Sequence, residues 1–549
     1  MKITENYLSN RSLFDEMKIN VPKFDQKVVR KNTKINPEWV HFGGGNFYRC
    51  FHAKVAQDLI NAGEWNTGII VVKTSGESSI QDFYHHLDYR SLTVTMKDDG
   101  GFDKELIAST AEALYFHPSN RHDAQRLVNV FKDESLKLVT LTITEKGYAT
   151  KDSTGNLLKE VVQDIQSGPD FAKLQTTITK LAYLLVERFN AGAFPLAVVS
   201  TDNFSHNGDR LKEAVLEIAY GWLKQGFVTN QFITYLDNGN RVTFPCTMVD
   251  RITPLPSIDI AKKLEEEGIE DMMPYTIGEH GKELSAFVNT EEIHYLVIED
   301  DFPNGRPAFE KADGVLMGSR ETVNNADLMK VCTCLNPLHT TLAIFGCLLG
   351  FDRIYKEVQD EDLLKLIEQI GFIEGLPVVK DPGIINPRTF IKEVIYKRLM
   401  NPNIPDTPQR IASDTSQKVG IRFGETLKAY VSAKDKGVEK LHFIPLTIAA
   451  WCRYLMAIND NGEPFLPSPD PLYEELHAYV STFTLEENVD VHSVLHPILS
   501  NKEIFSVNLE EIGLSEKIER YFARMITGPH AVRQVLREEL AAHAMEVDK

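Results

Sequence analysis

WVHFGGGNFYRCF, at residues 39–51, is the most informative stretch of this sequence. Four strand-forming residues lead into three glycines, and apolar residues then recur at helical spacing at positions 51, 55, 59 and 60. The β-branched run GIIVV at residues 68–72 has the composition of a parallel strand covered on both faces. The pattern predicts a strand, a glycine turn, a helix and a second strand, which together form a βαβ unit.

The three glycines suit the phosphate-binding turn of a dinucleotide fold. Gly43 and Gly45 occupy the first two glycine positions of G-x-G-x-x-G, and Tyr48 stands at the third. Gly43 would permit the tight turn, and Gly45 would let backbone N–H groups at the helix N-terminus approach a pyrophosphate. The third position governs helix packing and is the most replaceable. The flanking βαβ pattern favours dinucleotide binding over a simple turn.

The end of the second strand leaves the type of dinucleotide open. An acid that holds the ribose hydroxyls is expected there, but Val72 is followed by Lys73. Lys73 can contact a 2′-phosphate and favour NADP, or it can be a surface residue while Glu77 reaches back to the ribose. These residues leave both NAD and NADP possible.

The rest of the chain alternates strands and helices before it becomes mainly helical. Apolar runs at residues 138–143 and 195–200, with a helical stretch from Phe171 to Phe189 between them, indicate an open α/β sheet. Long helical periods follow a turn-rich segment at residues 299–307. We therefore predict the α/β class, with a polar, irregular leader at 1–36, a Rossmann-like dinucleotide-binding domain at 37–315 and a mainly α-helical domain at 316–549.

Composition excludes several classes of partner. The 549 residues carry 59 Lys and Arg against 78 Asp and Glu, a formal net charge of −19, and such a surface repels nucleic acid and anionic membranes. We expect no secretory leader, because the N-terminus lacks an apolar region, and no membrane span, because apolar runs fall short of roughly 20 residues. Six cysteines without a C-x-x-C pair fit a reducing cytoplasm.

The run DLMKVCTCLNPLH, which ends at His339, carries the other candidate chemistry. Zinc binding by Cys332, Cys334 and His339 would lack an obvious fourth ligand, and thiols among apolar residues are usually buried fillers. The rival interpretation is catalytic. Lys330 would be a base once burial lowers the pKa of its amine, Asn336 an amide donor to an oxyanion, and His339 an imidazole that orients substrate.

Several motifs resemble those of the mannitol dehydrogenase family of long-chain polyol dehydrogenases. The most specific is VTFPCTMVDRITP at residues 242–254, whose end matches the family signature V-D-R-I-x-P at every position. Together the similar segments span roughly residues 38–470. Supporting similarities are FGGGNF at 42–47, VSTDN at 199–203, IEDDF at 298–302, and residues 445–455.

The resemblance implies a modified Rossmann core in the N-terminal domain, a mainly helical C-terminal domain, and a cleft between them for metal-independent hydride transfer. It implies a nicotinamide cofactor, which we expect to be NAD without excluding NADP. The cofactor contacts implied by the matching motifs are Phe42, Gly43, Gly44, Gly45, Asn46, Phe47 and Asp250.

The resemblance also assigns residues to the chemistry. Lys330 matches the family's lysine base, Asn336 its oxyanion asparagine, and His339 its histidine. Asn203 matches a second asparagine that holds the reacting oxygen. Basic substrate contacts are implied for Arg410 and Lys418, in a stretch where Ser413 replaces the histidine of other members.

One departure from the family bears on mechanism, because Lys330 precedes Asn336 by six residues where the common pattern has five. In a regular helix the extra residue would turn Lys330 a further 100° away from Asn336 and His339. Pro337 cannot donate to the carbonyl of Thr333 and favours the first helical position or a disrupted turn. We therefore predict a π-bulge or helix break between Cys332 and Asn336 that absorbs the extra residue.

The resemblance is strongest to the fructuronate reductase branch, so the expected reaction is the reversible reduction of D-fructuronate to D-mannonate. Reduction of D-tagaturonate and interconversion of fructose and mannitol are the nearest alternatives, and a non-catalytic nucleotide-binding regulator is a remote one. The expected partner is a small sugar acid or polyol, and the expected state is a monomer or weak homo-oligomer.

Overall fold

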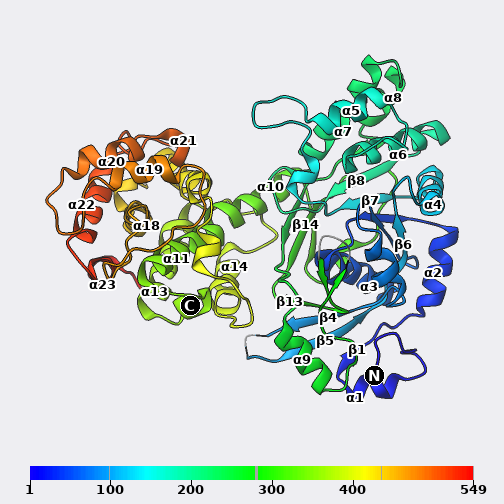
Figure 1. The fold of residues 1–549 in the computed structure, drawn as a ribbon, viewed down its shortest axis with the longest axis horizontal. Helices are drawn as coiled ribbons and strands as arrows, with labels where there is room; N and C mark the ends of the chain where they lie inside the picture. The colour runs from blue at the N-terminus through cyan, green and yellow to red at the C-terminus, as the bar shows by residue number, and fades with distance from the viewer. Residues whose placement is uncertain (98, 278–281, 434–435, 548–549) are drawn as a thin grey trace. The chain divides into compact units, whose positions relative to one another are not determined.

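The computed structural model describes residues 1–97, 99–277, 282–433 and 436–547. The chain folds into two units: the first runs from Met1 to Asn324 apart from residues 98–100, and the second begins at Asn325 (Figure 1). Helix α10 (Arg320–Met329) carries the chain from one unit to the other. The domain limits expected from the sequence, 36/37 and 315/316, stay predictions.

A six-stranded parallel sheet forms the centre of the first unit. Its strands lie in the order β6-β3-β2-β7-β8-β9, and each of its pairings is parallel. Numbered by their position along the chain, these strands follow the Rossmann order 3-2-1-4-5-6. The strands are β2 (Trp39–Phe42), β3 (Ile69–Lys73), β6 (Thr110–Tyr115), β7 (Leu138–Leu141), β8 (Leu196–Ser200) and β9 (Val242–Thr243).

Both faces of this sheet are covered, which explains its continuous apolar strands. Val40, Val139 and Val198 pack into a core with the helices drawn beside β7 and β8 in Figure 1. The side chain of His41 turns to the opposite face and stacks on Tyr48. The helices of this unit are α1 (Arg11–Glu16), α2 (Gln26–Ile35), η1 (Tyr48–His52), α3 (Ala53–Asn61), η2 (Ser79–His85), α4 (Arg121–Lys132), η3 (Glu145–Tyr148), α5 (Lys159–Ser167), α6 (Thr177–Gly192), α7 (Asn207–Lys224), α8 (Asn230–Asp237), α9 (Ile258–Glu266) and η4 (Phe309–Lys311).

Smaller sheets complete the first unit. One has the order β1-β5-β4-β13, a second has the order β10-β14-β15, and β11 pairs with β12. The strands are β1 (Ile19–Asn20), β4 (Ser91–Met96), β5 (Phe102–Ile107), β10 (Thr247–Asp250), β11 (Tyr275–Ile277), β12 (Lys282–Leu284), β13 (Phe287–Glu291), β14 (Tyr295–Glu299) and β15 (Val315–Gly318).

The expectation of an irregular leader at residues 1–36 is wrong. The segment forms α1, β1 and α2, and β1 pairs in parallel with β5. Asp25 caps α2 by accepting a hydrogen bond from the N–H of Lys27 at 2.8 Å. The buried positions of α2 are Gln26, Val29 and Thr33. Because two of these three are polar, the helical periodicity does not appear as a hydrophobic pattern.

In the described part of the second unit, the regular elements are helices, apart from an isolated bridge between Ile458 and Pro464. This confirms the expected mainly helical domain. All twelve residues of α18 are buried, and Figure 1 shows this helix surrounded by others of the unit. The helices are η5 (Lys330–Cys334), α11 (Asn336–Leu349), α12 (Ile354–Val358), α13 (Glu361–Glu368), η6 (Gln369–Gly375), η7 (Leu376–Val378), α14 (Pro387–Glu393), η8 (Val394–Leu399), α15 (Pro408–Ile411), α16 (Thr415–Val419), η9 (Gly420–Gly424), α17 (Glu425–Ser432), η10 (Val438–Lys440), α18 (Phe443–Tyr454), α19 (Tyr473–Val480), α20 (Val491–Leu499), α21 (Lys502–Phe505), α22 (Ser515–Met525) and α23 (Ala531–His543).

Among the described residues, one helical run, Arg320–Leu349, is long and apolar enough to cross a membrane by length and composition. Its most apolar part is 83% buried inside the protein. That burial is typical of a core helix in a globular domain.

Arg188 of α6 holds together the backbone that leads into two central strands. Its guanidinium is fully buried and uses all five of its N–H groups on main-chain carbonyls. These acceptors precede β7 and β8, so one side chain sets where both strands begin. The acceptors are the carbonyl oxygens of Phe131, Asp133, Leu136, Phe194 and Pro195, at 2.7 to 3.0 Å.

We predict that Arg188→Met lowers the free energy of unfolding of the first unit by at least about 2 kcal/mol, because the carbonyls of Phe131 and Asp133 lose their side-chain donor and each buried carbonyl left without a donor costs about 1–3 kcal/mol. Urea unfolding followed by circular dichroism measures the loss. The control is Arg241→Met, since Arg241 is exposed and donates one long hydrogen bond. Equal losses in the two variants would contradict the role given to Arg188.

Candidate functional site

The turn after β2 is held between its two neighbouring strands. The N–H of Gly43 donates to the carbonyl of Val72 at 3.0 Å, and the N–H of Thr142 donates to the carbonyl of Phe42 at 2.8 Å. Gly43 has φ +112°, and a Cβ there would lie 2.2 Å from the carbonyl oxygen of Thr142. Both facts require glycine at this position, as the sequence predicts for the tight turn.

Gly45 faces open space. A Cβ at Gly45 would meet no atom within 4 Å, and the helix begins at the next residue, Asn46. Beside it lies a cavity of about 610 Å³ at the carboxyl ends of β2, β3, β7 and β8, where the strand order reverses. This switch point is where open α/β sheets bind their ligands. The lining includes Phe42, Gly43, Gly44, Gly45, Asn46 and Phe47, all expected from the sequence.

A π-helical turn replaces the missing third glycine. Tyr48 begins η1, its hydroxyl lies 2.9 Å from Thr110 Oγ1, and its ring stacks on His41 at 4.7 Å. A third glycine would allow the helix to pack closely on the sheet. Here a buried tyrosine occupies that position, and the wider π-turn accommodates its ring.

The end of β3 supplies a lysine to this cavity. Lys73 lines the cavity and donates to Ser79 Oγ at 3.1 Å, whereas the exposed Glu77 is not among the lining residues. Lys73, and not Glu77, is therefore the charged residue after β3 that reaches the cavity.

Asp202 is a cavity residue to which the sequence analysis gave no role. Its carboxylate accepts hydrogen bonds from the N–H groups of Ile143 and Thr144 and from the hydroxyl of Tyr148, at 2.7 to 3.1 Å. Burial raises its pKa. Asp202 therefore fixes the loop after β7 against the end of β8. The signal in the sequence was an acid two residues after a predicted strand.

Two expected site residues lie beside this cavity rather than in its lining. Asn203 is exposed in the turn after β8, next to Asp202, and Asp250 is the buried last residue of β10. Thr253 of the same signature, and Leu255 just after it, do line the cavity. The roles expected for Asn203 and Asp250 stay predictions.

We predict that Gly45→Ala preserves the melting temperature and weakens NADH binding at least about tenfold, because the added methyl group enters only the space expected for the pyrophosphate. Gly43→Ala, the matched variant, should weaken binding and also lower the melting temperature, since its Cβ collides with backbone. NADH fluorescence titration and thermal unfolding measure the two effects. Unchanged NADH affinity in Gly45→Ala would remove the glycine turn from the site.

In the second unit the predicted helix disruption is confirmed. Lys330–Cys334 is π-helical, Leu335 leaves helical geometry at φ −126° and ψ −63°, and α11 begins at Asn336 with Pro337 in its first turn. The N–H of Leu335 donates to the carbonyl of Lys330 at 3.1 Å, a bond that spans five residues. The turn takes up the extra residue between Lys330 and Asn336.

Lys330 is buried. Its side chain is 3% exposed, and its Nζ lies 3.8 Å from Asp327 Oδ1, one turn earlier. Asn336 is partly exposed at the first position of α11. His339 follows one turn later, where its N–H donates to the carbonyl of Leu335 at 3.1 Å. The three predicted residues thus flank one irregular turn.

Burial removes the charge from His339. It lowers the pKa of the imidazole to about 4, an effect partly opposed by Asp406 and reinforced by Arg422, Arg398 and Arg410. The ring is therefore neutral near pH 7 and can orient a hydroxyl without adding charge.

The two expected substrate contacts lie in the same neighbourhood. Arg410 on α15 is 61% exposed and pairs with Asp406. Lys418 on α16 donates to the carbonyl of Ser413 at 2.5 Å, and burial, followed by Arg422, lowers its pKa. Arg398 and Arg422 are further cations of this group that the sequence analysis did not single out.

Cys332 and Cys334 do not favour the zinc interpretation. Both are buried, and burial raises the pKa of Cys332 to about 12 and that of Cys334 still further. Zinc binds the thiolate. Among the described residues, neither thiol belongs to a group of His, Cys, Asp or Glu side chains close enough to share a metal ion, so both serve as packing in the irregular turn.

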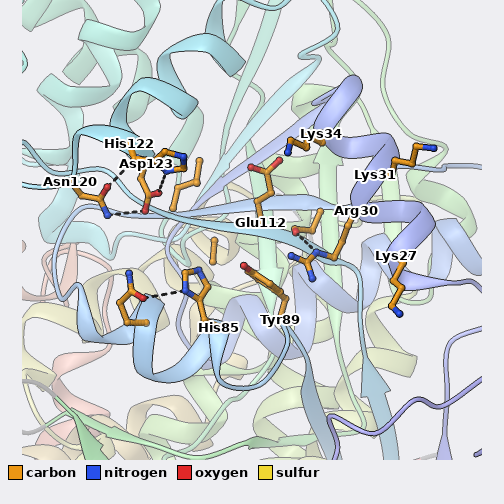
Figure 2. Close-up of a pocket in the computed structure, with 14 residues that line it drawn as sticks. Lys27, Arg30, Lys31, Lys34, His85, Tyr89, Glu112, Asn120, His122 and Asp123 are labelled. Carbon is orange, nitrogen blue, oxygen red and sulfur yellow. Dashed lines mark hydrogen bonds and ion pairs between the residues drawn. The ribbon is translucent and has the colours of Figure 1, made fainter.

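A second cavity, of about 770 Å³, lies at the edge of the six-stranded sheet beside α2 and β6 (Figure 2). Two of its charged groups already have partners, because Arg30 bonds to the carbonyl of Ala111 and to Asp88, and Glu112 is bound by Arg126. Figure 2 shows Lys31 directed away from it. It lies away from the strand switch point, so it is not part of the candidate site.

Comparison with known proteins identifies the family. Residues 37–311 match the mannitol dehydrogenase Rossmann domain, and residues 323–526 match the mannitol dehydrogenase C-terminal domain. The chain is 49% identical over 539 residues to D-mannonate oxidoreductase of Thermotoga maritima, covering 98% of this chain and 99% of the relative.

More distant relatives share the same architecture. Polyol:NADP oxidoreductase of Gluconobacter oxydans is 29% identical over 446 residues, 80% of this chain and 84% of the relative. The solved ternary complex of Pseudomonas fluorescens mannitol 2-dehydrogenase with NAD and D-mannitol aligns with a TM-score of 0.70 and 25% identity, covering 98% of this chain and 100% of the other. These findings confirm the resemblance seen in the motifs, and the chain belongs to the mannitol dehydrogenase family of oxidoreductases.

Proposed function

We propose that this protein is a nicotinamide-dependent oxidoreductase that interconverts D-fructuronate and D-mannonate. The observation that carries the proposal is the nearly full-length identity of 49% to an enzyme named D-mannonate oxidoreductase. The cations near His339 support a sugar acid over a neutral polyol, because a carboxylate complements them.

The cofactor we propose is NAD, held at the glycine turn. The cavity of about 610 Å³, the open space over Gly45 and the helix that begins at Asn46 fit a pyrophosphate on a helix N-terminus. Bound there, the nicotinamide would supply the hydride to the substrate ketone or take it from the alcohol. Lys73 is the residue that would contact a 2′-phosphate if NADP were used.

Lys330 is the proposed acid and base. In the reductive direction its ammonium group gives a proton to the carbonyl oxygen while the carbonyl carbon accepts the hydride, and in the oxidative direction its neutral amine removes the hydroxyl proton. Asn336 and Asn203 are proposed to donate hydrogen bonds to the reacting oxygen. Two amides and an ammonium group provide this stabilisation, so the proposed reaction is metal-independent.

We predict that Lys330→Ala lowers kcat by at least about 1,000-fold and changes the Kd for NADH by less than about threefold, because the amine acts on the substrate oxygen and not on the dinucleotide. Stopped-flow absorbance of NADH and fluorescence titration measure the two quantities. Lys428→Ala is the matched control, since Lys428 is 43% exposed and pairs with Glu425. Turnover near the wild-type value would refute the assignment.

A substrate panel tests the reaction itself. We expect kcat/KM for D-fructuronate with NADH to exceed the values for D-tagaturonate and fructose, and the value with NADPH, by at least about tenfold. Activity should survive dialysis against EDTA. A higher kcat/KM for fructose or tagaturonate would show that this sugar, and not fructuronate, is the substrate. NADH binding without turnover of any substrate would indicate a nucleotide-binding regulator.

A further inference from the structure

Arg422 is a half-buried cation of the second unit that no acid balances. Its Nη1 donates to Thr340 Oγ1 at 2.5 Å, and no carboxylate in the described residues lies within ion-pair distance of its guanidinium. Burial lowers its pKa to about 10, and no acidic neighbour opposes that effect. By contrast, Arg410 pairs with Asp406.

Arg422 lies beside the predicted catalytic residues of its own unit. Thr340, its hydrogen-bond partner, directly follows His339 on α11. The charge of Arg422 acts on both His339 and Lys418. The guanidinium, the imidazole and the Lys418 amine therefore share one neighbourhood.

The backbone that carries Arg422 is held rigidly. Arg422 is the middle residue of η9, and glycines stand at both ends of this π-turn. A Cβ at Gly420 would lie 2.6 Å from the carbonyl oxygen of Ile504, and a Cβ at Gly424 would lie 2.1 Å from that of Phe505. This close approach to α21 fixes the position of the turn, and a group placed in this way binds its ligand with little loss of entropy.

We propose that Arg422 binds the carboxylate of the substrate and thereby sets the preference for sugar acids over neutral sugars. The planar guanidinium has N–H groups left after the bond to Thr340, and its fork geometry matches a carboxylate. The substrate would supply the carboxylate that the Arg422 guanidinium lacks. The inference rests on the proposed function, which it deepens, and it concerns a residue that none of the family motifs described above includes.

The test is Arg422→Gln, assayed with D-fructuronate and with fructose, a ketose without a carboxylate. The expected result is a loss of at least about 100-fold in kcat/KM for fructuronate, mainly through KM, with the value for fructose changed less than about threefold. Arg422→Lys should recover part of the loss, because it restores the charge without the fork. Arg537→Gln, which changes a 66% exposed arginine of the same unit, should behave as wild type.

A measurement of substrate binding in the absence of turnover tests this inference separately from the proposed function. Calorimetric titration of D-mannonate into the enzyme with saturating NADH should show at least about 100-fold weaker binding in Arg422→Gln, with unchanged melting temperature. Equal losses for fructuronate and fructose, or unchanged mannonate affinity, would overturn the role of Arg422. If the wild-type enzyme binds mannonate through Arg422 but does not turn over fructuronate, the proposed reaction is wrong and the role of Arg422 stands.

Discussion

The irregular turn from Lys330 to Leu335 is the constraint on which the chemistry of the second unit depends. Six residues separate Lys330 from Asn336, and a straight α-helix would direct their side chains to different sides. The π-helical hydrogen bond from Leu335 to Lys330 takes up one residue, and Pro337 cannot restore the α-helical ladder. The turn is kept because buried elements pack around it.

Charge explains why this turn suits an anionic substrate. The whole chain carries a formal net charge of −19, yet the residues acting on His339 include three arginines and one acid. Partly buried cations close together repel one another, and burial already keeps His339 neutral. A carboxylate would lower the free energy of the cations around it, whereas a neutral polyol would leave them unbalanced. Arg422 is a better partner for the carboxylate than Arg410, because Arg410 is already paired with Asp406.

Elements with strong local signals were predicted well. The strand, glycine turn and second strand around residues 39–72 are found as expected, because buried parallel strands need continuous apolar runs and Gly43 needs a positive φ. The helix α2 was missed because Gln26 and Thr33 fill two of its three buried positions. Arg422 was missed for a different reason: an arginine in a helical segment is usually solvated, and only the contact with Thr340 and the close packing of its turn on α21 show that it is half-buried.

The sequence alone indicated the family, the βαβ unit at residues 39–72, and the need for a break before Asn336, because each of these follows from short motifs and local patterns of glycine, proline and apolar residues. Tertiary structure alone decided which charged groups meet. Lys73 rather than Glu77 lines the cavity, Asp202 fixes a loop, and Arg422 lies next to Thr340 from a segment 82 residues away. Charge and burial depend on neighbours that are distant in the chain, and no local pattern records them.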